Sequence, residues 1–168
     1  MIGLFNSSRQ ASEIGMAESG KILASNRKAY HDYHIDETHE AGVVLTGTEI
    51  KSVRAGSVNL RDSYAQVRNG EMWLMNVHIA PYEPASRQNV DPYRDRKMLM
   101  HRKEILRLFG RVQEKGLTLV PLRLYLKKNK AKVEIGLARG KKEYDKRDAI
   151  AKRESAREID RAVKTRAR

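Results

Sequence analysis

The chain has 168 residues, of which 40% are hydrophobic, and its 34 Lys and Arg against 21 Asp and Glu give a formal net charge of +13. A chain of this size can bury one ordinary core and carry extensions, and a field of this sign attracts a polyanionic partner. The lack of cysteine excludes a disulfide framework or a cysteine zinc site and suits a reducing, cytoplasmic setting. No apolar run approaches the ~20 residues of a membrane-spanning helix, so we expect no membrane partner.

Residues 1–20 predict a flexible extension ahead of the folded domain. They contain several Ser and Gly residues, and their apolar stretch is too short for a secretory signal. Met16 is an alternative start for the native chain, in which case the residues before it come from an extended reading of the gene.

The first part of the domain changes from strand to helix patterns. Residues 31–35 alternate with period two and predict a strand, and the β-branched run 41–46 predicts a second strand that is buried on both sides. Over residues 48–55 the period becomes that of a helix, with Ile50 and Val53 on the core face.

The clearest local signal is a hairpin. Residues 63–68 and 71–79 flank Asn69-Gly70, a dipeptide that tolerates the positive φ of a tight turn. Residues 117–127 and 131–138 predict two further strands that close the domain.

Between these pairs of strands, the period predicts a longer helix from about residue 94 to residue 115. Many short strands with intervening helices favour a mostly β (α+β) fold, an OB-type closed β-barrel over residues 21–140 with two to three helices. The apolar face of the longer helix would hold Met98, Ile105, Phe109 and Val112.

Residues 141–168 form a basic C-terminal tail. Roughly two in five of its residues are Lys or Arg, and its apolar side chains are too sparse to offset the ~1–2 kcal/mol per residue needed to order a backbone. Acid-before-base pairs such as Glu143–Arg147 contribute only about 0.2–0.5 kcal/mol each to a helix. We therefore expect the tail to be disordered when free and helical when bound to its polyanionic partner.

Cations and aromatic rings supply the chemistry of RNA binding. Phosphate contacts need long basic side chains, whereas Tyr33, Tyr64 and Tyr144 could stack on unpaired bases. The alternatives are solvated surface charge for the cations, and packing against the barrel for Tyr33 and Tyr64. The candidate phosphate contacts are Lys51, Arg54, Arg96, Lys97, Lys141 and Lys142.

Three further candidates have equally plain structural alternatives. Asn26 can read a base edge or cap a turn, and Leu99 can protrude towards RNA or belong to the core side of the predicted helix. Glu40 would repel phosphate unless it accepts a hydrogen bond from RNA or orients a neighbouring cation; otherwise it is a turn residue between two strands.

Enzyme and metal chemistry are disfavoured by the pattern. His31 and His34 would point to opposite faces of the predicted strand, so they could not bind one metal ion. Glu49-Ile50-Lys51 resembles the E-x-K of a divalent-metal nuclease, with Asp36 as a partner carboxylate, but the helical pattern there keeps the set apart. We expect neither catalytic residues nor a cofactor.

A series of motifs in order resembles the bacterial small protein B (SmpB) family, from about Lys21 to the C-terminus. The resemblance implies an OB-type barrel that binds the tRNA-like domain of transfer-messenger RNA (tmRNA) and delivers it, as a monomer, to stalled ribosomes in trans-translation. The motifs are Asn26-Arg27-Lys28-Ala29, His31-Asp32-Tyr33, Glu40-Ala41-Gly42, Gly47-Thr48-Glu49-Ile50-Lys51-Ser52, Asn59-Leu60-Arg61-Asp62-Ser63-Tyr64-Ala65, Arg96-Lys97, the run from Lys115 to Leu122, and the run from Gly140 to Arg147.

By matching position, the resemblance assigns tmRNA binding to Asn26, Glu40 and Leu99, and more weakly to Tyr33, Lys51, Tyr64, Arg96 and Lys97. It implies that the tail enters the empty mRNA channel of the small subunit, with Tyr144 stacking on a base of the ribosomal RNA. The residues expected at the decoding centre are Lys141, Lys142, Tyr144, Asp145, Lys146 and Arg147.

The chain departs from the family at Ala162-Val163-Lys164, where a more apolar triplet is common, so no role is assigned there. The alternative function is that of a generic OB-type RNA-binding protein, such as a ribosomal protein or a translation factor. Such a protein would not prefer one RNA.

Overall fold

The structure, a computed structural model, describes residues 20–142, except 86, 88 and 115, together with residues 154–157, which are helical. The expected flexible extension and the tail beyond Lys142 lie outside these residues, apart from 154–157. The strands are β1 (Lys21–Ser25), β2 (Tyr33–Val43), β3 (Val58–Asn59), β4 (Tyr64–Arg68), β5 (Glu71–Met75), β6 (His78–Ile79), β7 (Arg96–Leu99), β8 (Leu117–Lys127) and β9 (Lys130–Gly140). The helices are α1 (Arg27–Asp32), α2 (Gly47–Arg54) and α3 (Arg102–Val112), with a short 3-10 turn at Glu83–Ala85.

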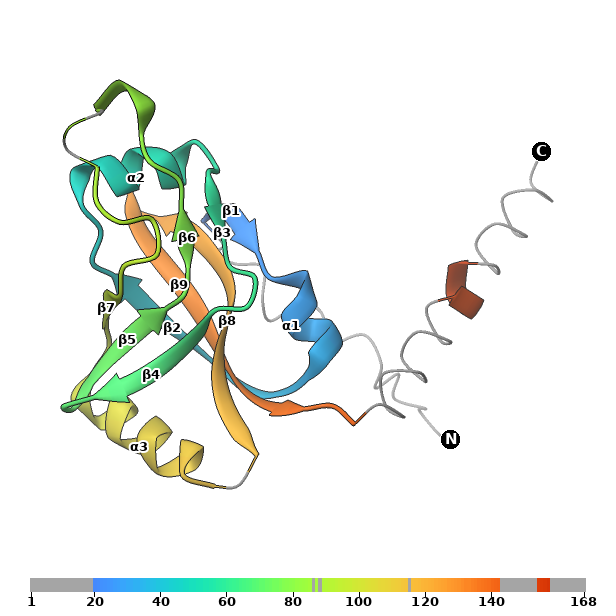
Figure 1. Cartoon of the computed structure of the whole chain (residues 1–168). Coiled ribbons are helices and arrows are strands. Elements are labelled where there is room, and N and C mark those ends of the chain that lie inside the picture. The colour runs from blue at the N-terminus through green and yellow to red at the C-terminus, as the bar shows by residue number, and fades with distance from the viewer. Residues whose placement is uncertain (1–19, 86, 88, 115, 143–153, 158–168) are drawn as a thin grey trace, which may run out of the picture.

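The strands close on themselves. Neighbours in the main sheet follow the order β1-β8-β4-β5-β7-β2-β9, and β8 also pairs with β9, so the strands from β8 to β9 form a ring (Figure 1). β1 is added to the outside of this ring through β8, and β3 pairs with β6 in a separate two-stranded sheet. The predicted mostly β, α+β fold of the OB type is confirmed.

Two tight turns follow from local chemistry. Asn69 (φ 51°) and Gly70 (φ 74°) join β4 to β5, and Lys128 (φ 48°) and Asn129 (φ 63°) join β8 to β9. Two consecutive positive φ values match the right-handed twist of the strands that they connect. The predicted hairpin turn at Asn69-Gly70 and the two strands predicted over residues 117–138 are confirmed, whereas the strand predicted over residues 71–79 divides into β5 and β6.

The predictions for residues 31–46 were wrong in detail. His31 belongs to α1, and the two expected strands are parts of a single strand, β2. The polar residues between the two expected strands also belong to β2, because β2 pairs with β9 along nearly its whole length. Like other strand residues, they alternate in exposure. That pairing is between residues distant in sequence, so a local pattern could not reveal it.

The long helix was predicted to start at about residue 94, which is too early. Residues 96–99 form β7, between β2 and β5, and the helix α3 begins only at Arg102. Met98 is a core residue of the barrel, whereas Phe109, expected in the core, is 45% exposed.

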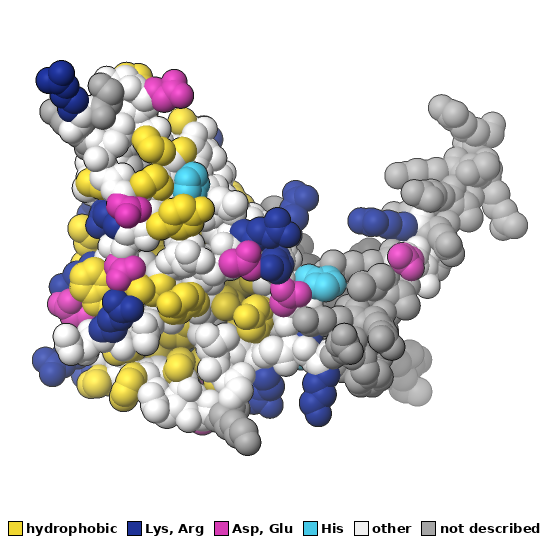
Figure 2. Space-filling model, viewed as in Figure 1, with side chains coloured by type: hydrophobic (Ala, Val, Ile, Leu, Met, Phe, Trp, Pro, Cys, Tyr) yellow, Lys and Arg dark blue, Asp and Glu magenta, His cyan; other side chains and the backbone are white. Residues whose placement is uncertain are grey.

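Charged and apolar side chains are mixed on the surface. On the face shown in Figure 2, Lys and Arg lie at several separate places with hydrophobic side chains between them. Charge alone therefore does not mark one interface on this face.

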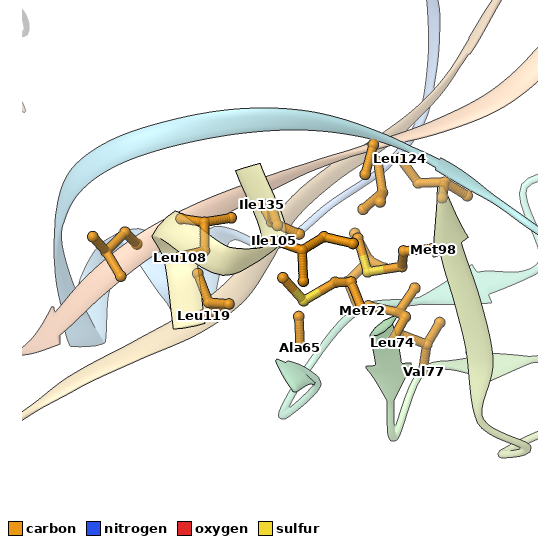
Figure 3. Close-up of a cluster of buried hydrophobic side chains, with 14 of the residues drawn as sticks. Ala65, Met72, Leu74, Val77, Met98, Ile105, Leu108, Leu119, Leu124 and Ile135 are labelled. Carbon is orange, nitrogen blue, oxygen red and sulfur yellow. The ribbon is translucent and has the colours of Figure 1, made fainter. Parts of the chain in front are cut away.

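The core fills the ring and continues beneath α3. Figure 3 shows Ile105 and Leu108 of α3 among side chains from the strands, including Leu119 and Ile135. Burial of each such side chain contributes about 1.5–3 kcal/mol to folding. α3 is thereby held to the barrel through one face and leaves its other face outside.

Candidate nucleic-acid interface

The outer side of β9, β2 and β7 carries several of the predicted residues. Gly42 of β2 lies opposite Leu99 of β7 on one side and Lys132 of β9 on the other. Because side chains alternate along a strand, Ala41 enters the core while Glu40 faces outward. We call Glu40, Gly42, Leu99, Lys130 and Lys132 the Leu99 surface.

Leu99 is a ridge between two hollows. It is 57% exposed, although it is a large apolar side chain. One hollow of about 430 Å³ is lined by Gly42, Ile50 and Lys132, among others. The other, of about 400 Å³, is lined by residues that include Lys97 and Arg102. An apolar ridge with cations on either side suits a sugar or base flanked by phosphates.

Gly42 permits this position of Leu99. A Cβ at residue 42 would lie 3.2 Å from Cβ of Leu99, so the leucine would have to move by a few tenths of an ångström. The glycine thus lets Leu99 lie directly over β2.

Glu40 orients cations. The Tyr125 hydroxyl donates a hydrogen bond of 2.5 Å to Oε2 of Glu40, and the Nζ atoms of Lys127 and Lys132 each lie 3.5 Å from its carboxylate oxygens. The hydrogen bond from Tyr125 holds the pKa of Glu40 below its ordinary value against partial burial, and the two lysines act in the same direction. Burial, and then Glu40 itself, raise the pKa of Tyr125, which stays a donor. Glu40 is therefore an ionised strand residue rather than a turn residue.

Lys97 and Lys51 are exposed or half-exposed, with local partners. Lys97 forms an ion pair with Glu71 on the neighbouring strand. The ammonium of Lys51 lies 5.3 Å from the centre of the Tyr82 ring, within the range of a cation–π contact. Both interactions are weak at the surface, so either lysine could exchange its partner for a phosphate.

Arg96, in contrast, is not a surface cation, and the expected phosphate contact was wrong. Its side chain is fully buried and donates four hydrogen bonds, to Glu49 Oε1 (2.9 Å) and to the backbone oxygens of Val77 (2.7 Å), Arg94 (3.0 Å) and Pro92 (2.9 Å). Two of these acceptors are local, and the other two, on Glu49 and Val77, come from distant parts of the chain. Their convergence explains why a cation lies inside.

Glu49 is the centre of this buried cluster. It accepts hydrogen bonds from Arg94 Nε (2.8 Å) and from the backbone N–H of Thr46 (2.8 Å), and it caps α2. Burial acts to raise the pKa of Glu49, but the hydrogen bonds from Arg94 and Thr46 and the charges of Arg96 and Arg94 outweigh it and lower the pKa. Because Glu49 is buried and Lys51 is exposed, the nuclease-like set does not assemble.

Asn26, Tyr33 and Tyr64 come together at the other end of β2. They line a hollow of about 200 Å³ with Lys28 and Thr118, among others. We call it the Asn26 hollow. Tyr33 begins β2 and Gly42 lies nine positions along it, a length of at most about 30 Å of extended strand, so this hollow and the Leu99 surface lie towards opposite ends of β2.

The side chain of Asn26 is committed to the fold. Its Nδ2 donates to the backbone oxygens of Leu60 (3.0 Å) and Pro121 (3.0 Å), and its Oδ1 accepts from the N–H of Ala29 (3.1 Å) as the cap of α1. The capping alternative is therefore the one that the structure supports. Asn26 shapes the hollow but offers it no evident base-reading group.

The two tyrosines differ in exposure. Tyr33 packs against Ala29, Val120 and their neighbours, whereas Tyr64 is 42% exposed. Tyr64 is thus the better placed of the two to stack on a base.

The tail leaves the barrel beside this hollow. The backbone N–H of Lys141 donates to the carbonyl of Asp32 (2.9 Å), and its Nζ donates to the carbonyl of Tyr30 (3.0 Å). Lys142 is exposed. Tyr144, Asp145, Lys146, Arg147 and the segment Ala162-Val163-Lys164 lie outside the described residues.

The sequence had suggested that His31 and His34 lie on one strand, and the structure shows that they do not. His31 is in α1 with its Nδ1 2.8 Å from Oδ1 of Asp32, and His34 is exposed on β2. In the part of the chain that the structure describes, no group of three or more His, Cys, Asp or Glu could hold a metal ion. Nor does any helix within residues 20–142 and 154–157, gaps aside, have the length and apolar content to cross a membrane.

Sequence reasoning missed Gly42, Tyr125, Lys127, Lys130 and Lys132. The signal for Lys130 and Lys132 was available: residues two apart at the start of a strand face the same side. The positions of Tyr125 and Gly42 depend on strand register, which the sequence did not reveal.

Comparisons with known proteins show which family the whole chain resembles. The chain matches the family model described as SmpB protein over residues 23–165. An SsrA-binding protein from Carboxydothermus hydrogenoformans is 64% identical over 146 residues, covering 87% of this chain and 98% of the relative. Another, from Roseiflexus castenholzii, is 64% identical over 149 residues, covering 88% of this chain and 94% of the relative.

A solved structure is similar as well. A chain described under the words "tmRNA-SmpB: a journey to the center of the bacterial ribosome" matches with a TM-score of 0.63 and 52% identity. The match covers 76% of this chain and 93% of that chain.

Proposed function

The chain belongs to the SmpB protein family, and on this premise we propose that it binds tmRNA, the SsrA RNA, and delivers it to stalled ribosomes in trans-translation. Its relatives are named for SsrA binding, and the similar solved structure is described with tmRNA and the ribosome. The function is that of a monomeric adaptor in the cytoplasm, without catalysis and without a cofactor.

The Leu99 surface is the proposed site for the tRNA-like domain of tmRNA. The observation that carries this assignment is the exposed Leu99 ridge between two hollows with cations in both. Leu99 would pack on a ribose or base, while Lys97, Lys130 and Lys132 contact phosphates. Glu40 would hold Lys127 and Lys132 in place. Lys51 extends the positive field along α2.

The Asn26 hollow is a second proposed contact for tmRNA, through Tyr64 above all, and the tail is the proposed ribosomal end. The hollow with Tyr64 adjoins Lys141, where the tail of residues 141–168 begins. We propose that Lys141, Lys142, Tyr144, Asp145, Lys146 and Arg147 reach the decoding centre and that the rest of the tail follows the empty mRNA channel, becoming helical there.

The first experiment measures the affinity of the full chain for tmRNA and for bulk tRNA at one fixed salt concentration. We expect a clear preference for tmRNA. Equal affinities would favour a generic OB-type RNA binder, the reading that net charge and barrel alone support.

The second experiment tests the site with Leu99→Asp. Loss of an apolar side chain that the RNA would bury, together with repulsion of phosphate by the new carboxylate, should weaken tmRNA binding about tenfold or more. The control is Ile22→Asp, because Ile22 on β1 is 51% exposed and lies outside the Leu99 surface. If both variants bind tmRNA as the wild type does, the site is elsewhere.

A further inference from the structure

The outer face of α3 carries large apolar side chains that the fold does not use. Ile105 and Leu108 point into the core (Figure 3). Leu106 is 56% exposed and Phe109 is 45% exposed. These two residues are three positions apart, so they are neighbours on the helix surface.

Leu106 is the centre of this outer face. Its neighbours at three and four positions along α3 are Arg102, Lys103, Phe109 and Gly110. All five residues are exposed. We call them the α3 face.

Gly110 has no evident role in the fold. A Cβ at this position would meet nothing within 4 Å among the described residues. A helix with glycine at an interior position is less stable than one with alanine there, because glycine loses more backbone entropy on folding. Its use here leaves the helix backbone bare beside Phe109, which permits close approach of a partner.

The charges that α3 presents outward are positive. Arg102 and Lys103 are exposed, and Arg107 shares Glu37 with Arg111 while its own side chain is 63% exposed. The acids of this region are engaged: Glu104 accepts from the N–H of His101 (3.3 Å), and Glu114 pairs with Arg111 (3.0 Å). A partner of complementary charge for the α3 face would therefore be anionic.

The α3 face is continuous with the Leu99 surface. Arg102 lines the same hollow of about 400 Å³ as Lys97 and Leu99. Leu106 follows Arg102 by about one helical turn, or ~6 Å. In Figure 2, dark blue and yellow side chains lie close together at the lower left, where Figure 1 places α3.

We infer that the α3 face is a further contact for tmRNA, which rests on the proposed function. A ribose–phosphate segment leaving the Leu99 surface lies along α3, with phosphates at Arg102 and Lys103 and a base or ribose against Phe109 and Leu106. The RNA backbone approaches α3 closely at Gly110. Phosphate contacts beside an aromatic ring are the chemistry of RNA binding, whereas an amphipathic protein helix needs a groove, and the α3 face is convex.

Gly110→Ala gives the most discriminating test. Alanine should raise the melting temperature, because it favours the helix, and yet it should weaken tmRNA binding about three- to tenfold by occupying the approach. Unchanged or tighter tmRNA binding by this stabilised variant overturns the inference.

Two further variants separate base and phosphate contacts. Phe109→Ala should weaken tmRNA binding about fivefold or more. Arg102→Gln with Lys103→Gln should lower the magnitude of the slope of log affinity against log salt by roughly 1.4–1.8, for two phosphates. Ile22→Ala is the matched control, an exposed aliphatic outside both surfaces, and should change neither quantity.

The source of the RNA is decided by a second readout, the association of preformed complexes with stalled ribosomes. If the α3 variants keep the wild-type affinity for tmRNA and lose only ribosome association, the occupant is ribosomal and the inference is wrong. If Leu99→Asp loses tmRNA and the α3 variants do not, the inference fails and the proposed function stands. If the wild type shows no preference for tmRNA, the proposed function itself fails.

Discussion

The two sides of β7 put neighbouring cations to opposite uses. Arg96 points inward and donates its hydrogen bonds to Glu49 and to backbone oxygens of the protein. Lys97 points outward beside the exposed Leu99. The sequence pair Arg96-Lys97 looks like one basic motif. The structure divides it into a buried arginine that holds the fold together and a half-exposed lysine on the surface.

The largest effect is expected at Glu49. Glu49→Gln leaves Arg96 and Arg94 without their counter-charge inside the protein, which should lower the free energy of unfolding by about 3–5 kcal/mol. The matched variant on the other side of β7 is Glu71→Gln, which removes the surface partner of Lys97 and should cost less than about 1 kcal/mol. Urea denaturation of both variants checks this; equal losses would erase the distinction between the two sides.

Gly42→Ala tests the outward side of β7, because Gly42 lies opposite Leu99. The added Cβ displaces Leu99 towards solvent, so stability should change by less than about 1 kcal/mol. The affinity for tmRNA should fall about three- to tenfold, because the ridge is no longer in place. A titration of tmRNA and a melting curve on the same sample test both parts. A large loss of stability with intact affinity would show that Gly42 serves packing alone.

A smaller effect is expected for Lys97→Gln. The slope of log affinity against log salt should fall in magnitude by about 0.7–0.9, for one phosphate, with little change in stability. Lys21→Gln, on β1, is the control and should leave the slope unchanged. If the two variants share one slope, Lys97 contacts no phosphate.

The smallest effect concerns pH. The pKa of Glu40 is lowered from its ordinary value of 4.5, so its ionised form stabilises the folded protein above that pH, and this contribution is lost as the pH falls through the lowered folded-state value. The difference in stability between the wild type and Glu40→Gln should therefore be constant above about pH 5 and shrink below it. A difference that grows on acidification would contradict the assignment.

Much of the fold could be predicted because its signals are local. Asn69-Gly70 fixes one hairpin turn through its positive φ values, and Thr46 with Glu49 begins α2 through a capping box. β7 could not be predicted, because four residues become a strand only through pairing with β2 and β5.

The candidate site divides in the same way. Residue type and motif indicated Glu40, Lys97 and Leu99, all of which face outward. The burial of Arg96 and Asn26 depends on backbone carbonyls that only the folded chain brings together. Motif resemblance therefore indicated these positions without separating side chains that face outward from side chains that hold the fold together.

The central claim, that the Leu99 surface binds tmRNA, is tested most directly by hydroxyl-radical footprinting of the full chain with and without tmRNA. Leu99 and Ile22 are similarly exposed in the free chain, at 57% and 51%. We predict that tmRNA protects Leu99 from oxidation and leaves Ile22 as reactive as before. Undiminished oxidation of Leu99 at saturating tmRNA would contradict the account.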